Sequence, residues 1–457
     1  MLYEPRNHWL LLSSMVLLAA ALAGSAHGAD ALTLPEAIDR ALASNPALKG
    51  SAVAVEKQAL ERRIARGQRL PQVDLTAGYT RYHYPSLVTP IRQPGTFPPL
   101  DRDIANLGAA LSLPLYAGGK LVAGESLAAH THEASREALR AAGQDLIFNV
   151  ASTYTKALHL RDLQHASAFR IRTLETEEKS TALKMEQGRA SRLDLMRLQT
   201  QLSQSRHDVL SIAQAEQDAL ALLAALLGER NSLPPLAEGV AFNATLPGSR
   251  QEAIAAALAQ HPELGKAQAL GEAANDRLDM ARGDLRPQVS LVGRLQQTAG
   301  GDLHSYDSSH IGVQMALPIF DGAVRKHRID QASLESERSR LAFEDTENQL
   351  RAEVQQAYGA VEEARSRRTV ALQAEREAQE ALHIETLRYK EGEGAITDLL
   401  SAEAAFWNAK VSRLQAEYDG AVTQARLLRA TGGLSAASIR QASIGSGAPP
   451  SQGEGQP

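Results

Sequence analysis

The stretch that decides the fold is LPEAIDRALASNPAL at Leu34–Leu48, which returns as RQEAIAAALAQHPEL at Arg250–Leu264. A second pair follows, RLPQVDL at 69–75 and LRPQVSL at 285–291, and both pairs share an offset of 287 − 71 = 216 residues. Internal similarity at a fixed distance indicates a duplicated structural unit. The chain is therefore expected to fold as two tandem copies of one unit.

Further along the chain the two copies differ by one insertion. Gly188 matches Gly392 and Asp194 matches Asp398, now at an offset of 392 − 188 = 204 residues. The difference of 216 − 204 = 12 residues falls in the first copy at Pro85–Pro99, which is rich in proline and glycine. Because this composition is typical of a loop, we expect a longer loop in the first copy only.

These offsets divide the chain. The first repeat is placed at residues 29–232 and the second at 250–433, with a linker at 233–249 between them. Residues 434–457 are rich in Ser, Gly and Pro. Such segments bury too little apolar surface to fold, so this tail is predicted to be disordered.

Residues 1–28 have the features of a cleaved signal peptide. The apolar stretch Trp9–Leu22 follows a basic start and is followed by small residues. A membrane anchor is the alternative, but about 14 apolar residues fall short of the roughly 20 that span a bilayer. No later segment reads as apolar enough for a spanning helix. Any membrane insertion of the exported chain is therefore expected to use β-strands.

The composition favours long helices over several ordinary globular domains. The 457 residues include 4% aromatic side chains and no cysteine, while good helix formers such as Ala, Leu, Gln, Glu and Arg dominate. The lack of cysteine excludes disulfides, thiolate metal sites, a cysteine nucleophile and a lipid-modified N-terminal cysteine. A net charge of −5 gives no reason to expect a nucleic acid partner.

Each repeat is predicted to hold one very long helix and two shorter ones. At 1.5 Å per residue the long helix spans roughly 100 Å, and the shorter helices, of roughly 50 and 55 Å, together match it. The shorter helices are therefore expected to stack end to end, antiparallel to the long one. The expected helices are Leu34–Arg66, Lys120–Gln187 and Ser191–Leu227, then Arg325–Glu391 and Thr397–Thr431.

Two stretches in each repeat alternate between apolar and polar residues, as half-buried strands do. Four strands cannot close a barrel, and open strand edges are not tolerated in lipid. Insertion into a membrane would therefore require two or three copies with cyclic symmetry; a soluble hairpin, which has the same alternation, is the alternative. The strands are expected around 73–80, 107–113, 289–296 and 311–317.

Aromatic residues gather around the first predicted hairpin. They either form part of an aromatic girdle at a membrane interface or pack under the longer loop. These residues are Tyr79, Tyr82, Tyr84 and Phe97.

Four paired motifs, taken together and in order, resemble the TolC-like outer-membrane efflux channel family. The resemblance covers about residues 32–433. It implies a mainly α fold with a membrane β-hairpin pair, in which a homotrimer forms a trimeric 12-stranded transmembrane β-barrel continued by a long periplasmic α-helical barrel. The motifs are the two pairs quoted above, LSLPLYAGGK with MALPIFDGAVRK, and MEQGRASRLDLMRLQTQL with YKEGEGAITDLLSAEAAFW.

The resemblance also implies a location and partners. The channel would lie in the outer membrane of a Gram-negative bacterium and extend into the periplasm, with outer membrane lipid, a periplasmic adaptor protein and an inner-membrane pump as partners. The leading interpretation is the passive exit duct of a tripartite efflux system for drugs or other small toxic compounds. The exit duct of a type I protein-secretion system is the alternative, and a periplasmic coiled-coil adaptor or scaffold is a third. No Walker motif is present, and no enzyme activity, catalytic residue, metal or cofactor is expected.

The family resemblance places the constricted end of the tunnel at the far turns of the long helices. Asp194 and Asp398 align with family carboxylates that select cations at this end, and Tyr389 aligns with a tyrosine of the closing network. Rings of carboxylates around a narrow axis attract cations. The turn residues expected to contact the adaptor are Gly188, Gly392 and Gly394.

The chain departs from the family pattern at this gate. Gly394 stands where some members carry an arginine, and Ser401 where a second acidic ring would lie. The latch is therefore expected to use Arg189 or Arg192. Helix capping is an alternative role for the aspartates, because the S-x-x-D pattern that ends at Asp194 is a capping box and the helix dipole favours acidic residues in a first turn.

Overall fold

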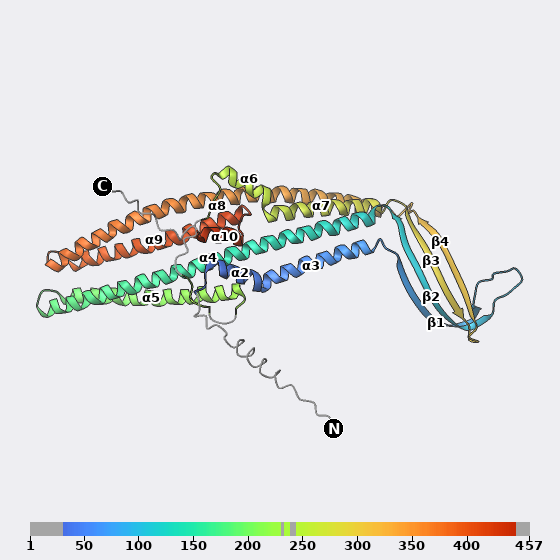
Figure 1. The fold of residues 1–457 in the computed structure, drawn as a ribbon, viewed down its shortest axis with the longest axis horizontal. Helices are drawn as coiled ribbons and strands as arrows, with labels where there is room; N and C mark the ends of the chain where they lie inside the picture. The colour runs from blue at the N-terminus through green and yellow to red at the C-terminus, as the bar shows by residue number, and fades with distance from the viewer. Residues whose placement is uncertain (1–30, 230–232, 238–243, 445–457) are drawn as a thin grey trace, which may run out of the picture.

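The computed structural model describes residues 31–229, 233–237 and 244–444 of the 457-residue chain. The described chain is a long rod with a β-sheet at one end and two helical hairpin tips at the other (Figure 1). The signal peptide predicted at 1–28 and residues 445–457 of the predicted tail lie outside the described residues.

The sheet combines one hairpin from each repeat. Its four antiparallel strands follow the order β1-β2-β3-β4, so the repeats join through the pair β2–β3. The insertion in the first repeat connects two strands that are longer than predicted. The strands are β1 (Gln72–Leu87), β2 (Leu100–Ala117), β3 (Gln288–Ala299) and β4 (Ser305–Ala316).

The strand register gives the sheet one apolar face. Residues that lie opposite each other on neighbouring strands share a face, and the row that begins at Leu75 continues through Ala109, Leu295 and Ser309. Apolar residues dominate this face, as the alternation predicted, whereas Asp74, Arg294, Gln296 and His310 lie on the other. The apolar face comprises Val73, Leu75, Ala77, Leu107, Ala109, Leu111, Leu113, Leu291, Leu295, Ile311, Val313 and Met315.

The long helices and the shorter helices that follow them begin and end within a residue or two of the predicted positions. Each leaves the sheet, runs the length of the rod, and returns as a shorter helix after a glycine turn (Figure 1). The first pair is α4 (Lys120–Glu186) with α5 (Arg192–Leu227), and the second is α8 (Val324–Glu391) with α9 (Ile396–Ala430).

The helix predicted at Leu34–Arg66 is in fact two helices, α2 (Leu34–Ser44) and α3 (Pro46–Gly67). Proline lacks the N–H that a continuous helix needs. Asn45, which precedes Pro46, instead caps the new helix, because its side chain accepts hydrogen bonds from the N–H groups of Ala47 and Leu48. The second repeat breaks in the same way at His261–Pro262, between α6 (Arg250–Gln260) and α7 (Pro262–Gly283).

The shorter helices meet end to end, as their lengths predicted. The side-chain amide of Asn45 donates to the carbonyl of Leu226 at 2.9 Å, where α5 ends. Gly228 then turns the chain with φ +70°, and a Cβ there would lie 3.1 Å from the Ser44 carbonyl oxygen. In the second repeat Gly432, also at φ +70°, comes equally close to His261.

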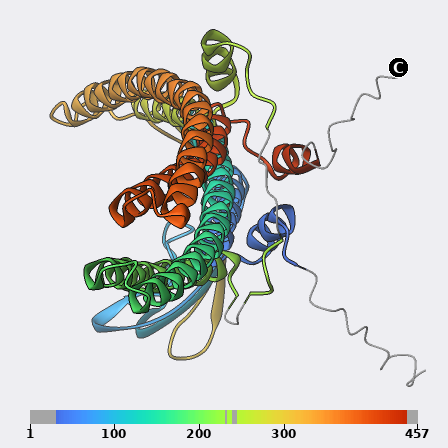
Figure 2. The ribbon, with the colours of Figure 1, turned by 90° about the vertical axis from the view of Figure 1, so that its left-hand side faces the viewer.

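The helices form a curved wall, which Figure 2 shows end-on. On the sheet side the neighbours follow the order α3–α4–α7–α8, so α3 and α8 lie at its edges. On the tip side α9 packs against α4, which joins the α4/α5 hairpin to the α8/α9 hairpin.

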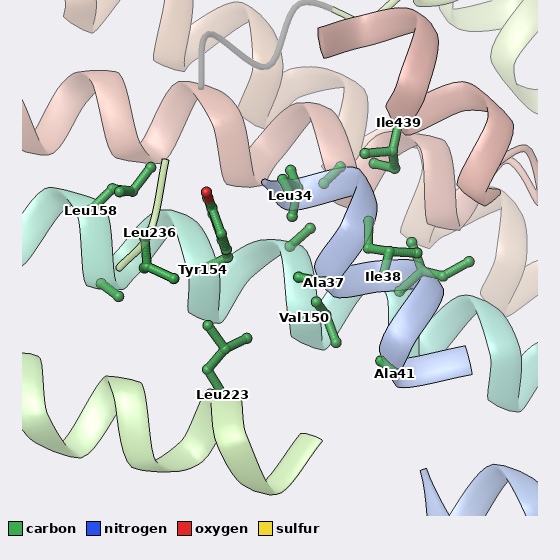
Figure 3. Close-up of a cluster of buried hydrophobic side chains, with 14 of the residues drawn as sticks. Leu34, Ala37, Ile38, Ala41, Val150, Tyr154, Leu158, Leu223, Leu236 and Ile439 are labelled. Atoms are coloured by element: carbon green, nitrogen blue, oxygen red, sulfur yellow. The ribbon is translucent and has the colours of Figure 1, made fainter. Parts of the chain in front are cut away.

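The largest core lies at mid-height, where the short helices meet (Figure 3). Its central side chain is Tyr154, which is fully buried and donates its hydroxyl to the Leu32 carbonyl at 2.7 Å. Burial raises the pKa of Tyr154 to about 12. Leu34, Val150 and Leu223 pack around it, so the core is built mainly from aliphatic side chains.

The prediction of a disordered tail from residue 434 is wrong for its first part. Residues Ala436–Ile444 form helix α10, which packs on α2. Leu434 and Ile439 enter the mid-height core, and Arg440 holds both carboxylate oxygens of Asp39 at 2.7 Å. The tail as a whole is rich in Ser, Gly and Pro, and its few apolar residues, such as Leu434 and Ile439, were overlooked because the prediction used the average composition.

The expectation that no later segment is apolar enough to span a membrane is also wrong, since α5 meets the length and composition of such a span. Leu223 and Leu227 are fully buried in the mid-height core, which accounts for part of this apolarity. However, only 11% of the residues in the most apolar 18-residue stretch of α5 are buried in the single chain. Helix α5 therefore presents an apolar face that the chain itself leaves uncovered.

We predict that Gly118→Ala destabilises the protein more than Gly322→Ala does. The two glycines are equivalent in the repeats and have φ of +65° and +67°, so alanine strains each backbone by about 1–2 kcal/mol. Only at Gly118 would the new Cβ also collide with a carbonyl oxygen, that of Gly283 at 2.3 Å. Thermal unfolding followed by circular dichroism checks this, and equal losses would contradict it.

Candidate functional site

The two hairpin tips are sharp turns built on glycine. Gly188 has φ +72° and Gly392 has φ +82°, and a Cβ on either would meet nothing within 4 Å. These positions therefore need glycine for backbone conformation rather than for space. Gly394 differs, because its N–H donates to the Arg388 carbonyl at 3.0 Å and a Cβ would lie 3.1 Å from the Tyr389 nitrogen.

The two tip aspartates lie at equivalent positions but have different partners. Asp194 belongs to a complete capping box: its carboxylate accepts from the Ser191 N–H at 3.0 Å, and its own N–H donates to the Ser191 hydroxyl at 3.2 Å. Asp398 lies in the first turn of α9, but the capping position there is Ala395, which has no side-chain acceptor. Asp398 is exposed, and within the described chain its carboxylate has no hydrogen bond or ion pair.

Tyr389 joins the two hairpins near their tips. Its side chain is 8% exposed, and its hydroxyl lies 2.9 Å from the hydroxyl of Thr181 on α4. The ammonium group of Lys184 donates to the Tyr389 carbonyl at 3.3 Å and lies 4.1 Å from the centre of the ring. This arrangement combines a neutral hydrogen bond with a cation–π contact.

A small apolar cluster surrounds Tyr389 and brings all four tip helices together. It is separate from the mid-height core and contains no aromatic residue other than Tyr389. Its buried members are Leu174, Leu198, Leu202, Tyr389, Ile396 and Leu399.

Within the described chain, the basic residue that contacts Tyr389 is Lys184, and a role of Arg189 or Arg192 in the latch stays a prediction. Both arginines are exposed on the turn, and neither side chain contacts the other hairpin within the described residues. Ser401 is also exposed. The contact of Lys184 depends on how the α8/α9 hairpin packs on α4, which residue spacing along one helix does not reveal.

Sequence reasoning missed a buried ion pair farther from the tips. Arg170 on α4 donates to Glu403 on α9 through Nε at 2.6 Å and through a terminal nitrogen at 2.8 Å. The side chains are 8% and 10% exposed, and the guanidinium lies 5.0 Å from the centre of the Trp407 ring. Charged residues on long helices usually face solvent, so neither residue carried a sequence signal for burial.

A second contact between α4 and α9 lies nearer the mid-height core. The rings of His159 and Tyr418 stack with centroids 5.3 Å apart. Burial lowers the pKa of His159, although Asp162 and Asp419 oppose this shift, and burial raises the pKa of Tyr418. Both side chains are therefore neutral near pH 7.

Two further observations concern residues away from the tips. Within the described residues, no group of three or more His, Asp or Glu side chains has the arrangement of a metal site. The aromatic residues of the first hairpin do not pack under its loop in the single chain. Their side chains are exposed, with Tyr79 at 66%, Tyr84 at 75% and Phe97 at 82%.

The sequence matches the outer membrane efflux protein family over residues 37–229 and 253–433. The chain belongs to this family. Its members lie in the outer membrane and reach into the periplasm, so the localisation predicted from the sequence is confirmed.

Individual relatives match nearly the whole chain. The outer membrane efflux protein BepC of Brucella suis is 24% identical over 93% of this chain and 91% of its own. The alkaline protease secretion protein AprF of Pseudomonas aeruginosa is 25% identical over 87% and 84%. The solved structure of CusC has a TM-score of 0.78 at 19% identity and covers 88% of this chain and 92% of CusC, which shows the shared fold.

We predict opposite effects of two substitutions at equivalent helix starts. Ser191→Ala removes the cap of α5 and is expected to lower the free energy of unfolding by about 1 kcal/mol. Ala395→Ser supplies the missing cap of α9, three residues before Asp398, and is expected to raise it by up to about 1 kcal/mol. Thermal unfolding of both variants checks the prediction. If Ala395→Ser has no stabilising effect, Asp398 does not serve as the acidic partner of a cap.

Proposed function

We propose that the protein is a homotrimer whose hairpins close one twelve-stranded β-barrel in the outer membrane. The sheet presents an apolar face suited to lipid, yet β1 and β4 are edge strands within the described chain. Open edges are too costly in hydrocarbon, and single-chain barrels begin at about eight strands. Pairing of β4 with β1 of the next copy removes every edge. The trimer number itself comes from the family resemblance.

The helical wall supports the same arrangement. Its two edge helices carry exposed apolar side chains on the sheet side, including Val53, Leu60 and Ile64 on α3 and Leu334 and Leu341 on α8. On the tip side, the apolar face of α5 is uncovered. In a ring of three copies each edge meets the opposite edge of a neighbour, which buries these stripes and continues the barrel as a tunnel.

This trimer would act as the passive exit duct of a tripartite efflux system for drugs or other small toxic compounds. The observation that carries the proposal is the amphipathic, open-edged sheet at one end of helices roughly 100 Å long. An inner-membrane pump would supply the energy, and a periplasmic adaptor would contact the tip turns at Gly188, Gly392 and Gly394. A type I secretion duct is the second candidate, favoured by the likeness to AprF.

The tips would form the gate of the duct. Tyr389 would hold the α8/α9 hairpin against α4, with Lys184 in the place expected for an arginine. Asp398 would form a ring of three exposed carboxylates around the narrow end and attract cations. Asp194 is a weaker candidate, since its carboxylate is already engaged in the capping box.

The decisive experiment is outer-membrane fractionation, followed by imaging of the purified particle and conductance measurement in planar bilayers. A threefold particle that forms channels supports the proposal, and a soluble monomer overturns it. A deletion strain then separates the two candidates. Sensitivity to small toxic compounds indicates efflux, whereas loss of one secreted protein with unchanged sensitivity indicates type I secretion.

Asp398→Asn is expected to weaken the block of single-channel current by multivalent cations, because it removes one negative charge from each copy at the narrow end. Current is measured in bilayers against increasing concentrations of a trivalent cation. Asp194→Asn is the matched control, with a smaller expected effect. Unchanged block in Asp398→Asn would remove this residue from the gate.

Tyr389→Phe is expected to favour the open tip, because it removes the hydroxyl that contacts Thr181. A neutral hydrogen bond contributes about 1 kcal/mol, which changes the ratio of open to closed tips about fivefold for each copy. The measurement is the mean single-channel conductance. Tyr358→Phe is the control, since that exposed hydroxyl on the same helix donates to Gly248 and not to the other hairpin. Equal conductance of the two variants would argue against a latch at Tyr389.

A further inference from the structure

The pair of Arg170 and Glu403 fixes α9 on α4 in both height and rotation. Two nitrogens of the guanidinium meet the two carboxylate oxygens, and such a fork accepts only one relative orientation of the groups. The ring of Trp407, one turn along α9 from Glu403, lies against the guanidinium. A shift of α9 along α4 would therefore break two charge-assisted hydrogen bonds and a cation–π contact together.

The links on the tip side of this pair are weaker. Tyr389 contributes one neutral hydrogen bond to Thr181 and its contacts with Lys184, and the apolar cluster around it is small. Among the residues the structure describes, no other ion pair joins the two hairpins between Arg170 and the tips. This segment extends about 27 Å from Arg170 to Gly188 along α4, at 1.5 Å per residue.

The internal repeat does not preserve the pair. The equivalents of Arg170 and Glu403, at the offset of 204 residues, are Ala374 and Gln199. These two residues cannot form an ion pair, and Gln199 instead donates to Glu178 on α4, within its own hairpin. In the proposed trimer they belong to the seam between copies, where α8 meets α5 of a neighbour. In the proposed trimer, the ion pair therefore occurs where the two hairpins of one subunit meet and is absent where neighbouring subunits meet.

We propose that Arg170 and Glu403 are positioning residues for the gate: their ion pair is a pivot that holds α9 on α4 and confines tip movement to the segment beyond it. This inference rests on the proposed channel function and adds residues that the tip alone does not contain. Breaking the pair would leave a desolvated charge without its partner, which is costly, so the tip opens more readily by disrupting the contacts of Tyr389.

The first test replaces both charges together, as Arg170→Met with Glu403→Met. Removing both partners with apolar side chains of similar length leaves no unpaired buried charge, so the trimer is expected to fold. Without the fork, α9 can slide on α4. The closed-state conductance in planar bilayers is expected to rise about twofold or more, because the current through a constriction depends on its width.

A second readout follows the tip directly. The chain has no cysteine, so Glu393→Cys gives each copy a single spin label on the exposed turn. Pulsed electron paramagnetic resonance then measures distances between the three tips. The double variant is expected to broaden this distance distribution, whereas a role limited to stability would lower the unfolding temperature and leave the distribution unchanged.

Two further variants guard the interpretation. Arg170→Lys keeps the positive charge but lacks the fork, and is expected to change conductance in the same direction; it decides the question if the double variant does not assemble. The matched control is Arg413→Met with Glu375→Met, because Arg413 Nε contacts Glu375 at 2.6 Å within the α8/α9 hairpin. Arg413 also contacts Glu417 on its own helix at 2.8 Å, and the control removes this more exposed pair as well. This control is expected to keep the wild-type conductance and tip distances.

The outcomes separate the two proposals. If the wild-type protein forms no channel, the proposed function fails. If Tyr389→Phe raises conductance while the double variant and Arg170→Lys both behave as wild type, the gate stands and the pivot is overturned. If the control pair raises conductance as much as the double variant does, loss of any ion pair on α9 has this effect and the pivot is again overturned.

Discussion

Two shorter helices that pack end to end along one long helix must meet at their ends. The unpaired N–H and C=O groups at these ends then need hydrogen-bond partners across the junction. Asn45 meets this requirement with one side chain. Its oxygen accepts from two N–H groups at the start of α3, and its nitrogen donates to the last turn of α5. The mid-height core forms around this junction. The second repeat divides the task between two side chains: His261 accepts from the Glu263 N–H at the start of α7, and the Gln260 amide donates to the Thr431 carbonyl at the end of α9.

The duplication makes the small differences between copies informative. Asp194 and Asp398 occupy the same place in two equivalent helices, yet Ser191 engages only the first, because its counterpart is Ala395. The buried pair of Arg170 and Glu403 has no counterpart in the equivalent residues. Within the described residues, the two repeats thus present a hydrogen-bonded carboxylate at one tip and one without a hydrogen bond at the other. Within the chain, the ion pair of Arg170 and Glu403 joins α4 to α9.

Much of the fold follows from local patterns, and most of the tip does not. Long stretches without proline define α4 and α8, and alternation defines the strands, since both signals lie in neighbouring residues. The break at Asn45–Pro46 was missed although proline signals it, because the helical periodicity continues across it. The pairing of Arg170 with Glu403 joins residues far apart in the chain and leaves no local trace. Lys184 was missed for the same reason, because only the packing of two helices brings it to Tyr389.

Helix α10 has a consequence for the order in which the protein folds. Leu434, Ile439 and the pair of Arg440 with Asp39 complete a core whose other side is α2, the first helix described in the chain. Helix α2 therefore cannot be fully buried until the end of the chain has been exported and α10 has packed onto it. Contacts of such wide sequence separation form slowly, so we expect the mid-height core to be among the last parts of the chain to form.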